Sequence, residues 1–284
     1  MAVVISFAFY NQFSDVLQSR ILQQLNSIKT LKKNQVEKLI QSEWDSFINN
    51  PNLNSSHDIE IPDTILTSGI YDLTAHNKNK ELTIGLIQAE NDQFRVKVIP
   101  YSKIMNILLE RTGMGETGES YLVGKDHRMR SQSRFFKDSL PYTIKVKTEG
   151  VKNALSGELG KGLYNDYRAI QVYGVYGPIK ISNLQLAILS EIDESEVSEP
   201  LISLRKRLFG LMFLIMTIAI FISLFLTRII ANPILNMKKS LKVMTDGHYD
   251  ETDPFASNSN EIKEMFIALD ELKKSLSGSV NFSC

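Results

Sequence analysis

The sequence predicts an α+β fold with a long N-terminal helix, an antiparallel sheet domain, one membrane-spanning helix and a final two-helix coiled coil. Three observations predict it. Apolar residues recur at helical spacing from residue 14 to about residue 49. Short runs with strand-like alternation follow between residues 82 and 193. An uncharged stretch, 208–227, is then followed by two segments with heptad patterns.

Length and composition limit the classes of protein to which this chain could belong. The 284 residues leave room for about two domains. With 32 basic and 32 acidic side chains, the charge gives no reason to expect a nucleic-acid partner. The only cysteine is Cys284, so a disulfide framework is excluded. The histidines, His57, His76, His127 and His248, lack ligand spacing, so we expect no metal and no cofactor.

The first 13 residues are predicted to be the remnant of a first transmembrane helix. Residues 2–10 are apolar but too few to span a bilayer, and no positive region of a secretion signal precedes them. The alternative is a short buried or interfacial segment. From Ser14 to about Asn49 a long helix is expected, because no Pro or Gly interrupts it before Pro51.

Residues 14–207 are predicted to form the sheet domain. A hairpin is expected at 82–89 and 94–99, and helices at 102–112, 149–157 and 194–208. Further strands are predicted at 119–123, 128–135, 142–147, 162–168, 170–180 and 184–193. Several antiparallel strands with helical excursions define the α+β class.

The stretch "GMGETGESYLVG" (113–124) contains a formal G-x-G-x-x-G at Gly113, Gly115 and Gly118. A dinucleotide site needs a strand before such glycines and a helix after them. Here a helix comes first and a strand follows, so the glycines are interpreted as a helix stop and a turn.

Residues 208–227 are predicted to cross a membrane. Only Thr217, Ser223 and Thr227 are appreciably polar, and at about 1.5 Å per residue such a helix covers the roughly 30 Å hydrocarbon core. A buried core helix, the alternative, would normally show a polar side. Basic residues are nearly balanced on the two flanks, so charge leaves the orientation open.

Residues 228–280 resemble a HAMP domain, the membrane-proximal relay of bacterial sensors. The resemblance rests on Pro233 at the start of the first helix, the Gly247 and Tyr249 connector, and Glu261 opening the second helix. The family usually has Asp before this glutamate, where the chain has Asn260. Two heptad helices, doubled by a second chain, would form a four-helix homodimeric coiled coil; the alternative is an unrelated exposed hairpin. The expected relay residues are Pro233, Ile234, Met237, Leu241, Met244, Gly247, Tyr249, Glu261, Ile262, Met265, Leu269, Leu272 and Leu276.

The outer part resembles Cache domains, the PAS-like sensor modules that lie outside bacterial membranes. The matching stretches are "ILLERTGMGETGESYLVGKDHRMRSQSRFF" and "LYNDYRAIQVYGVYGPIKISNLQLAILSEIDESE". Two departures are Ala169, where Gly often follows Asp-Tyr-Arg, and Leu186, where Trp is often found. The resemblance implies an inner-membrane protein with an extracytoplasmic sensor domain and a cytoplasmic HAMP domain.

A small-molecule site is expected around the central strands, because side chains there combine apolar bodies with polar tips, and two guanidiniums suit a carboxylate. The alternative is that the arginines pair with surface acids and the tyrosines pack in the sheet. A run of acids from Asp193 to Glu199 is read either as a helix start or as a carboxylate pair. The candidate ligand-binding residues are Tyr121, Arg130, Ser131, Arg134, Asp166, Tyr173 and Tyr176.

Together these features predict a membrane sensor that binds an extracytoplasmic small molecule and relays the signal to an output module beyond Cys284. No catalytic residues are assigned to this chain. The full-length protein is expected to be a sensor histidine kinase of a two-component system. Alternatives are a chemotaxis receptor, a nucleotide cyclase or a phosphatase, and a membrane anchor without ligand.

Overall fold

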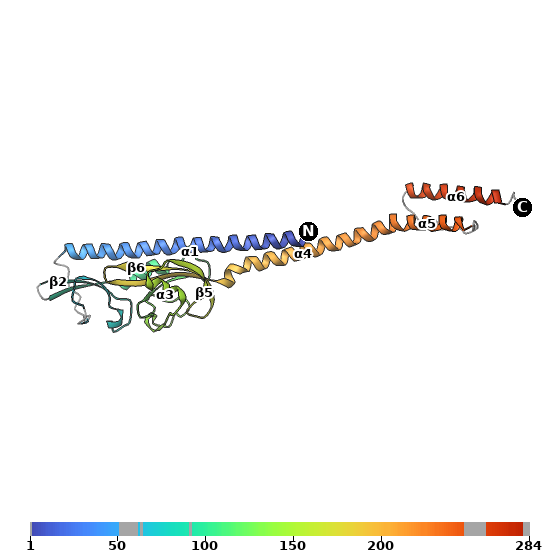
Figure 1. The fold of residues 1–284 in the computed structure, drawn as a ribbon. Helices are drawn as coiled ribbons and strands as arrows, with labels where there is room; N and C mark the ends of the chain where they lie inside the picture. Colours follow the sequence, from blue (N-terminus) through green and yellow to red (C-terminus); the bar gives the residue numbers. More distant parts are fainter. Residues whose placement is uncertain (1, 51–61, 63–64, 91–92, 247–259, 281–284) are drawn as a thin grey trace. The chain divides into compact units, whose positions relative to one another are not determined.

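The computed structural model describes residues 2–50, 62, 65–90, 93–246 and 260–280. The chain divides into two compact units, Val4–Arg205 and Met1–Val3 with Lys206–Cys284, and each is described by itself. The larger unit is of the predicted α+β class, with a long N-terminal helix and antiparallel sheets. In Figure 1 the helix α1 runs along these sheets.

Helix α1 (Ala2–Asn49) is continuous, so the predicted apolar remnant and the predicted long helix form one element. Its inner stripe contains Leu25, Val36, Ile40 and Phe47, which are buried. These residues recur every three to four positions or multiples of that spacing, so they share one side of the helix. The opposite side carries polar residues and a few exposed apolar ones, including Leu31.

Two antiparallel sheets follow α1. The first has the order β1-β2-β3, with β1 (Gly69–Asp72), β2 (Ile84–Glu90) and β3 (Gln93–Ile99). The second has the order β4-β7-β6-β5, with β4 (Glu119–Gly124), β5 (Gly160–Asn165), β6 (Gln171–Ile181) and β7 (Leu184–Asp193). Short helical elements connect them: η1 (Thr74–His76), α2 (Tyr101–Leu109), η2 (Pro141–Thr143) and α3 (Glu149–Ser156).

The second sheet is covered on both faces. Because side chains alternate along a strand, Leu122 and Ile188 point to the face where they join Val36 and Ile40 of α1 in one core. The neighbours of these strand residues, Tyr121 among them, point to the other face and pack against α3 and the segment before it. This second face carries the candidate site.

The predicted helix stop and turn are confirmed between α2 and β4. Gly113 and Gly115 have φ values of 77° and 70°, in the left-handed region that glycine occupies without strain. A Cβ on Gly118 would lie 1.9 Å from the carbonyl oxygen of Met114. All three glycines are therefore needed for the backbone path, and the order of helix, turn and strand is the reverse of a dinucleotide fingerprint.

The strand predictions are confirmed for the hairpin and for β4, β6 and β7, but not for 128–135 and 142–147. That segment holds only isolated bridges, Val123 to Met129 and Arg128 to Lys145. A serine side chain in this segment takes up a backbone N–H group that could otherwise join a strand-to-strand hydrogen bond. The hydroxyl of Ser131 accepts a hydrogen bond from the N–H of Leu122. Strand β1 was not predicted.

The predicted strand 162–168 also ends earlier than expected, at Asn165. The Asp166 carboxylate accepts hydrogen bonds from the N–H groups of Arg168 and Ile170, and this turns the chain. Ala169 sits in this turn with φ of 62°, a left-handed conformation that glycine would adopt with less strain.

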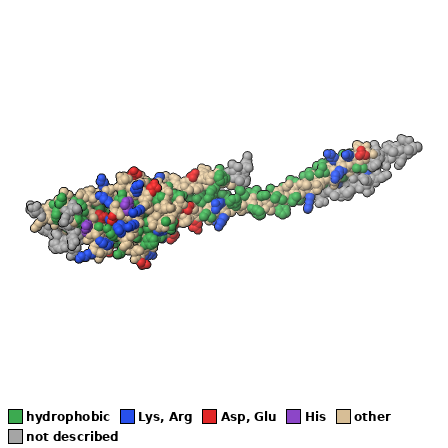
Figure 2. All heavy atoms as spheres, turned by 60° about the horizontal axis from the view of Figure 1, so that its bottom comes forward, with side chains coloured by type: hydrophobic (Ala, Val, Ile, Leu, Met, Phe, Trp, Pro, Cys, Tyr) green, Lys and Arg blue, Asp and Glu red, His purple; other side chains and the backbone are tan. Residues whose placement is uncertain are grey.

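Helix α4 (Glu194–Leu226) begins directly after β7 and continues through a π-helical segment, η3 (Thr227–Ala231), into α5 (Asn232–Thr245). Among the described residues, Glu194–Thr245 is the one helical run long and apolar enough to cross a membrane. Its apolar side chains are exposed, including Phe213 at 74% and Phe221 at 68%. Figure 2 shows hydrophobic side chains over the visible surface of this run.

Helix α6 (Asn260–Val280) contacts α5. The buried contact residues include Met237 and Met244 of α5, and Phe266 and Leu269 of α6. Other members of the predicted heptads remain exposed in the single chain: Ile234, Leu241, Met265 and Leu272. Gly247 and Tyr249 lie outside the described residues, as do the side chains of Glu261 and Leu276.

Candidate functional site

Two buried glutamates lie directly opposite each other on neighbouring strands. Glu119 of β4 pairs with Glu191 of β7, and both side chains point to the face covered by α3. Their residues are 6% and 2% exposed. Like charges in directly opposed positions destabilise a sheet, and a buried carboxylate is costly unless it is paired. An apolar pair would pack this position at lower cost, so the arrangement marks a candidate functional site.

Tyrosine hydroxyls hold Glu191 from two sides. Its Oε2 accepts a hydrogen bond from Tyr121 at 2.8 Å, and its Oε1 accepts one from Tyr164 at 2.9 Å. Burial raises the pKa of Glu191 to about 8; the two hydroxyls oppose this shift, and the charges of Glu119 and Asp166 add to it. Near neutral pH Glu191 is therefore largely a neutral acid.

Glu119 is held in a similar way. Its Oε1 accepts a hydrogen bond from the hydroxyl of Tyr167 at 2.5 Å, and its Oε2 accepts one from the N–H of Arg134 at 3.2 Å. Burial raises the pKa of Glu119, although these hydrogen bonds oppose the shift. The guanidinium of Arg134 donates to the carbonyl of Gly118 at 3.2 Å rather than to a carboxylate.

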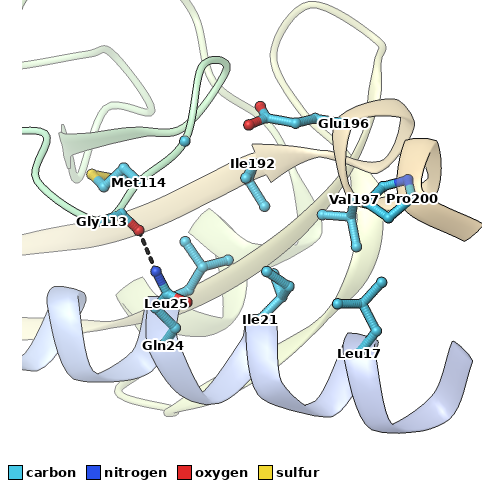
Figure 3. Close-up of a pocket in the computed structure, with 11 residues that line it drawn as sticks. Leu17, Ile21, Gln24, Leu25, Gly113, Met114, Ile192, Glu196, Val197 and Pro200 are labelled. Carbon is cyan, nitrogen blue, oxygen red and sulfur yellow. Dashed lines mark hydrogen bonds between the residues drawn. The ribbon is translucent and has the colours of Figure 1, made fainter. Parts of the chain in front are cut away.

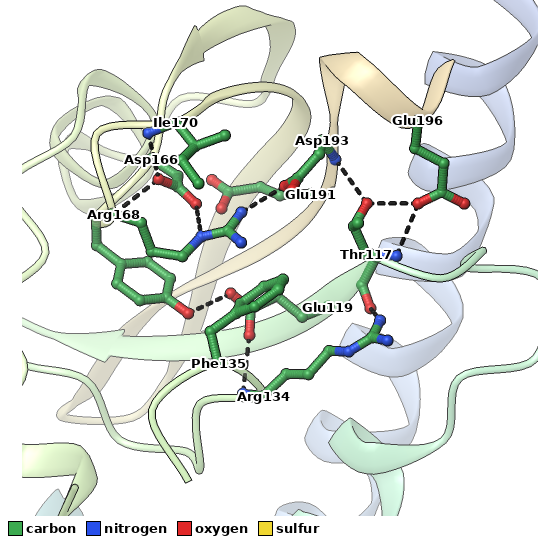
Figure 4. Close-up of polar contacts among 12 residues, drawn as sticks. Thr117, Glu119, Arg134, Phe135, Asp166, Arg168, Ile170, Glu191, Asp193 and Glu196 are labelled. Carbon is green, nitrogen blue, oxygen red and sulfur yellow. Dashed lines mark hydrogen bonds and ion pairs between the residues drawn. The ribbon is translucent and has the colours of Figure 1, made fainter. Parts of the chain in front are cut away.

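A guanidinium beside the glutamates bridges two further acids. Arg168 bonds Asp166 through Nε and Asp193 through an Nη, each at 2.5 Å. Its guanidinium also lies 3.5 Å from the ring centroid of Phe135, a stacked position that favours a cation. Figure 4 shows this bridge beside the two glutamates.

The carboxylate cluster, defined as Glu119, Asp166, Glu191 and Asp193 with Arg168 among them, has more acids than bases. Aromatic rings surround it: Tyr121 meets Tyr167 edge to face at 5.5 Å, and Phe136 meets Tyr167 at 5.8 Å. Surplus carboxylates beside aromatic faces suit a protonated amine, since both attract a cation.

The predicted ligand-binding residues fall in different places. Tyr121, Arg134 and Asp166 belong to the cluster or touch it directly. Tyr176 lies on the same face nearby, where its hydroxyl accepts a hydrogen bond from Asn153.

The other three lie elsewhere. Arg130 forms ion pairs with Asp72 and Asp126, each at 2.9 Å. Ser131 bonds the backbone. Tyr173 points to the face of the sheet that α1 covers.

Three members of the cluster, Glu119, Arg168 and Glu191, are not among the residues predicted from the sequence. Neither are Tyr164 and Tyr167, which donate hydrogen bonds to Glu191 and Glu119. One signal was available. In "ESYLV" Glu119 lies on the same side of the strand as Tyr121 and Val123. In "LQLAILSEID" Glu191 lies on the same side as Ala187 and Leu189. An acid in phase with apolar positions is a candidate for an inward-facing charge.

A cavity of about 180 Å³ lies between α1, the glycine turn and the start of α4. Figure 3 shows its largely apolar lining, with Leu17 and Ile21 of α1 facing Ile192 and Val197. Gln24 donates to the carbonyl oxygen of Gly113 across it at 2.5 Å.

Glu196, in the first turn of α4, binds the other side of the glycine turn. It accepts hydrogen bonds from the N–H groups of Glu116 at 2.8 Å and of Thr117 at 2.7 Å. Although burial raises the pKa of Glu196, the hydrogen bonds from Thr117 and Glu116 hold it below the usual range. The acidic run at the start of α4 is therefore part of the fold: Asp193 ends β7, and Glu196 binds the N–H groups of the glycine turn.

Within the part of the chain that the structure describes, no group of three or more His, Cys, Asp or Glu side chains could hold a metal ion.

No protein family model matches this chain, and no curated protein matches it. Among solved structures, the chain is similar to the ligand-binding domain of the Pseudomonas fluorescens chemoreceptor CtaA in complex with L-leucine. The identity is 11%, the TM-score is 0.42, and the match covers 64% of this chain and 99% of that one.

Two further solved structures are similar. One is the periplasmic sensory domain of the Campylobacter jejuni chemoreceptor Tlp1, with 12% identity, a TM-score of 0.36, and 68% and 94% of the two chains covered. The other is the extracellular domain of the putative histidine kinase mmHK1S-Z2, with 13% identity, a TM-score of 0.35, and 68% and 96% covered. At these TM-scores the likeness carries no functional argument.

Proposed function

We propose that this chain is a membrane sensor. Residues 14–207 would bind a small molecule outside the membrane, residues 208–227 would cross it, and residues 228–280 would act as a HAMP relay to a signalling module such as a histidine kinase. A chemotaxis receptor is the alternative with the same sensor and relay parts.

One observation carries the proposal: Glu191, which forms a buried pair with Glu119 of β4, lies on β7, the strand that leads directly into the apolar helix α4. Glu191 is three residues before Glu194, where α4 begins. A ligand that changes the charge of these glutamates or the distance between them would therefore act on the N-terminus of α4 through the few backbone residues that join β7 to α4. Such a two-state coupling needs only about 1–3 kcal/mol to change the output 5- to 150-fold.

The chemistry of the cluster favours a ligand with a protonated amine. The ammonium would take the place of a missing counter-charge between Glu119 and Glu191, and binding would draw both acids into their ionised forms. An α-amino acid adds a carboxylate, for which the guanidiniums of Arg134 and Arg168 are the nearby cations.

The test is thermal stabilisation of the full chain in detergent by the twenty L-amino acids and simple primary amines. At least one protonated amine should raise the midpoint of unfolding, as any ligand that prefers the folded state does. Glu119→Gln and Glu191→Gln should each weaken the apparent affinity about tenfold or more, since each removes a charge-assisted contact.

Glu90→Gln is the matched control, because Glu90 is an exposed acid at the end of β2 in the other sheet. It should leave the response unchanged. If no amine stabilises the wild type, or if the Glu119 and Glu191 variants respond as the wild type does, the amine site is wrong.

A further inference from the structure

A polar cavity lies on the α1 face of the sheet, between the middle of α1 and the edge strand β5. Its volume is about 420 Å³. It is separate from the carboxylate cluster, which occupies the opposite face. Its lining residues are Asn26, Lys29, Thr30, Lys33, Asn34, Leu159, Gly160 and Lys161.

The lining is cationic. It contains three lysines, amide and hydroxyl donors, and no acidic side chain. Lys29 and Lys33 are one helical turn apart, so their like charges share one side of α1 and repel each other. Lys33 lies 3.7 Å from Glu37, a partly exposed pair of small energetic weight. Lys161 approaches from β5.

Lys29 is the most informative of the three. The residue is only 4% exposed, and its ammonium donates one long hydrogen bond, 3.4 Å, to the carbonyl oxygen of Tyr176. An ammonium has three donors, and among the described residues no carboxylate forms an ion pair with Lys29. Burial lowers the pKa of Lys29, and the neighbouring charge of Lys33 lowers it further.

We call this cavity the lysine groove, after Lys29, Lys33 and Lys161. We propose that it binds a multiply charged oxyanion of the phosphate or phosphomonoester class. Lys29, Lys33 and Lys161 supply three positive charges, which match a dianion better than a single carboxylate. Asn26, Thr30 and Asn34 supply neutral donors around it. The bound anion gives Lys29 a counter-charge that no carboxylate among the described residues supplies.

The test is calorimetric titration of the full chain with inorganic phosphate, in nanodiscs of phosphatidylcholine, at constant ionic strength maintained with chloride. One saturable site is expected. Lys33→Gln and Lys161→Gln should each weaken binding about tenfold, the usual effect of losing a charge-assisted hydrogen bond. Lys147→Gln, at an exposed position outside the groove, should bind as the wild type does.

Lys29→Met separates binding from folding. It should abolish phosphate binding while leaving the unfolding midpoint unchanged or higher, because it removes a buried ammonium that has no carboxylate partner. Absence of saturable heat up to on the order of 10 mM phosphate, or equal affinity in the wild type and all three groove variants, would overturn the proposal.

The same titration in discs that contain phosphatidic acid distinguishes the source of the anion. Competition by the lipid assigns the groove to a headgroup phosphate, and unchanged binding assigns it to a soluble anion. Failure of the amine screen would leave these outcomes unaffected, because the two sites are on opposite faces of the sheet.

Discussion

At the scale of single residues, the candidate site depends on Glu119 and Glu191, which lie opposite each other across β4 and β7. The sequence predicts only some of the residues around them. Tyr121, Arg134 and Asp166 were selected because their side chains combine apolar and polar parts. Glu119 and Glu191 were missed, because a charged residue within a strand is usually on the solvent side. That they face each other depends on the pairing of β4 with β7, strands whose paired residues are about 70 positions apart. A local sequence pattern therefore does not predict which residues of β4 and β7 face each other.

The protonation of Glu191 should be visible in the pH dependence of stability. Its pKa is about 8 in the folded chain and about 4.3 in an unfolded one. The folded state therefore holds a proton that the unfolded state has lost between these values. This stabilisation is fully present below about pH 4.3 and is lost as pH rises through about 8. Glu191→Gln should flatten this fall and gain on the order of 1–3 kcal/mol at pH 8.5 relative to the wild type.

Thermal unfolding of the wild type and of Glu191→Gln at several values between pH 5 and pH 9 measures this difference. Glu119 retains its own raised pKa in the variant, so a smaller slope should remain. Parallel curves for the two proteins would show that Glu191 is ionised throughout this range.

At the scale of secondary structure, most helices and strands could be predicted, but β1 and the irregular segment between β4 and α3 could not. The helices and the strands β6 and β7 have strong periodic patterns, which decide their type. The composition of the segment between β4 and α3 favours a β-strand, but the segment forms only isolated bridges. Its serine hydroxyls and arginine side chains bind backbone groups instead; Arg128, for example, donates to the carbonyl oxygen of Tyr142. Such side-chain bonding is specified by tertiary contacts rather than by local sequence.

The approach of β5 to β6 allows a matched test of the site's support. Gly162 and Gly174 are directly opposed. A Cβ on Gly174 would lie 2.1 Å from the hydroxyl oxygen of Tyr164, whereas a Cβ on Gly162 would meet nothing within 4 Å. Gly174→Ala should displace Tyr164 from Glu191 and cost about 1–3 kcal/mol.

Gly162→Ala should be neutral or slightly stabilising, because it restricts the unfolded chain without a clash. Both variants can be compared by chemical denaturation of the full chain in detergent. An equal loss in both would mean that strand propensity, rather than the Tyr164 contact, sets the cost.

At the scale of the whole chain, the sequence indicates the order of the sheet domain, the apolar helix and the final helices. Each of them has a distinct hydrophobic period or composition. The α+β class and the one long apolar helix are found as predicted. The assembly of the last two helices is a different matter. Within one chain Ile234 and Leu241 are exposed, and they would be buried only in the predicted homodimer, which stays a prediction.

That second copy can be tested by cysteine crosslinking. In a Cys284→Ser background, Leu241→Cys should form disulfide-linked dimers in membranes, because Leu241 is 45% exposed and lies in the predicted seam. Lys239→Cys, on the opposite side of α5, is the control and should crosslink much less. Addition of the ligand of the outer domain should change the yield at position 241. Equal crosslinking at both positions would contradict a homodimer through this seam.

The glycine turn has a consequence for how the ends of the larger unit are linked. Gln24 of α1 holds the carbonyl of Gly113, and Glu196 of α4 holds the N–H groups of Glu116 and Thr117. Both helices are thus fastened to a stretch only a few residues long. An insertion of one residue there would let the chain keep one attachment but not both. The length of this stretch therefore fixes the axial offset of α1 against the start of α4.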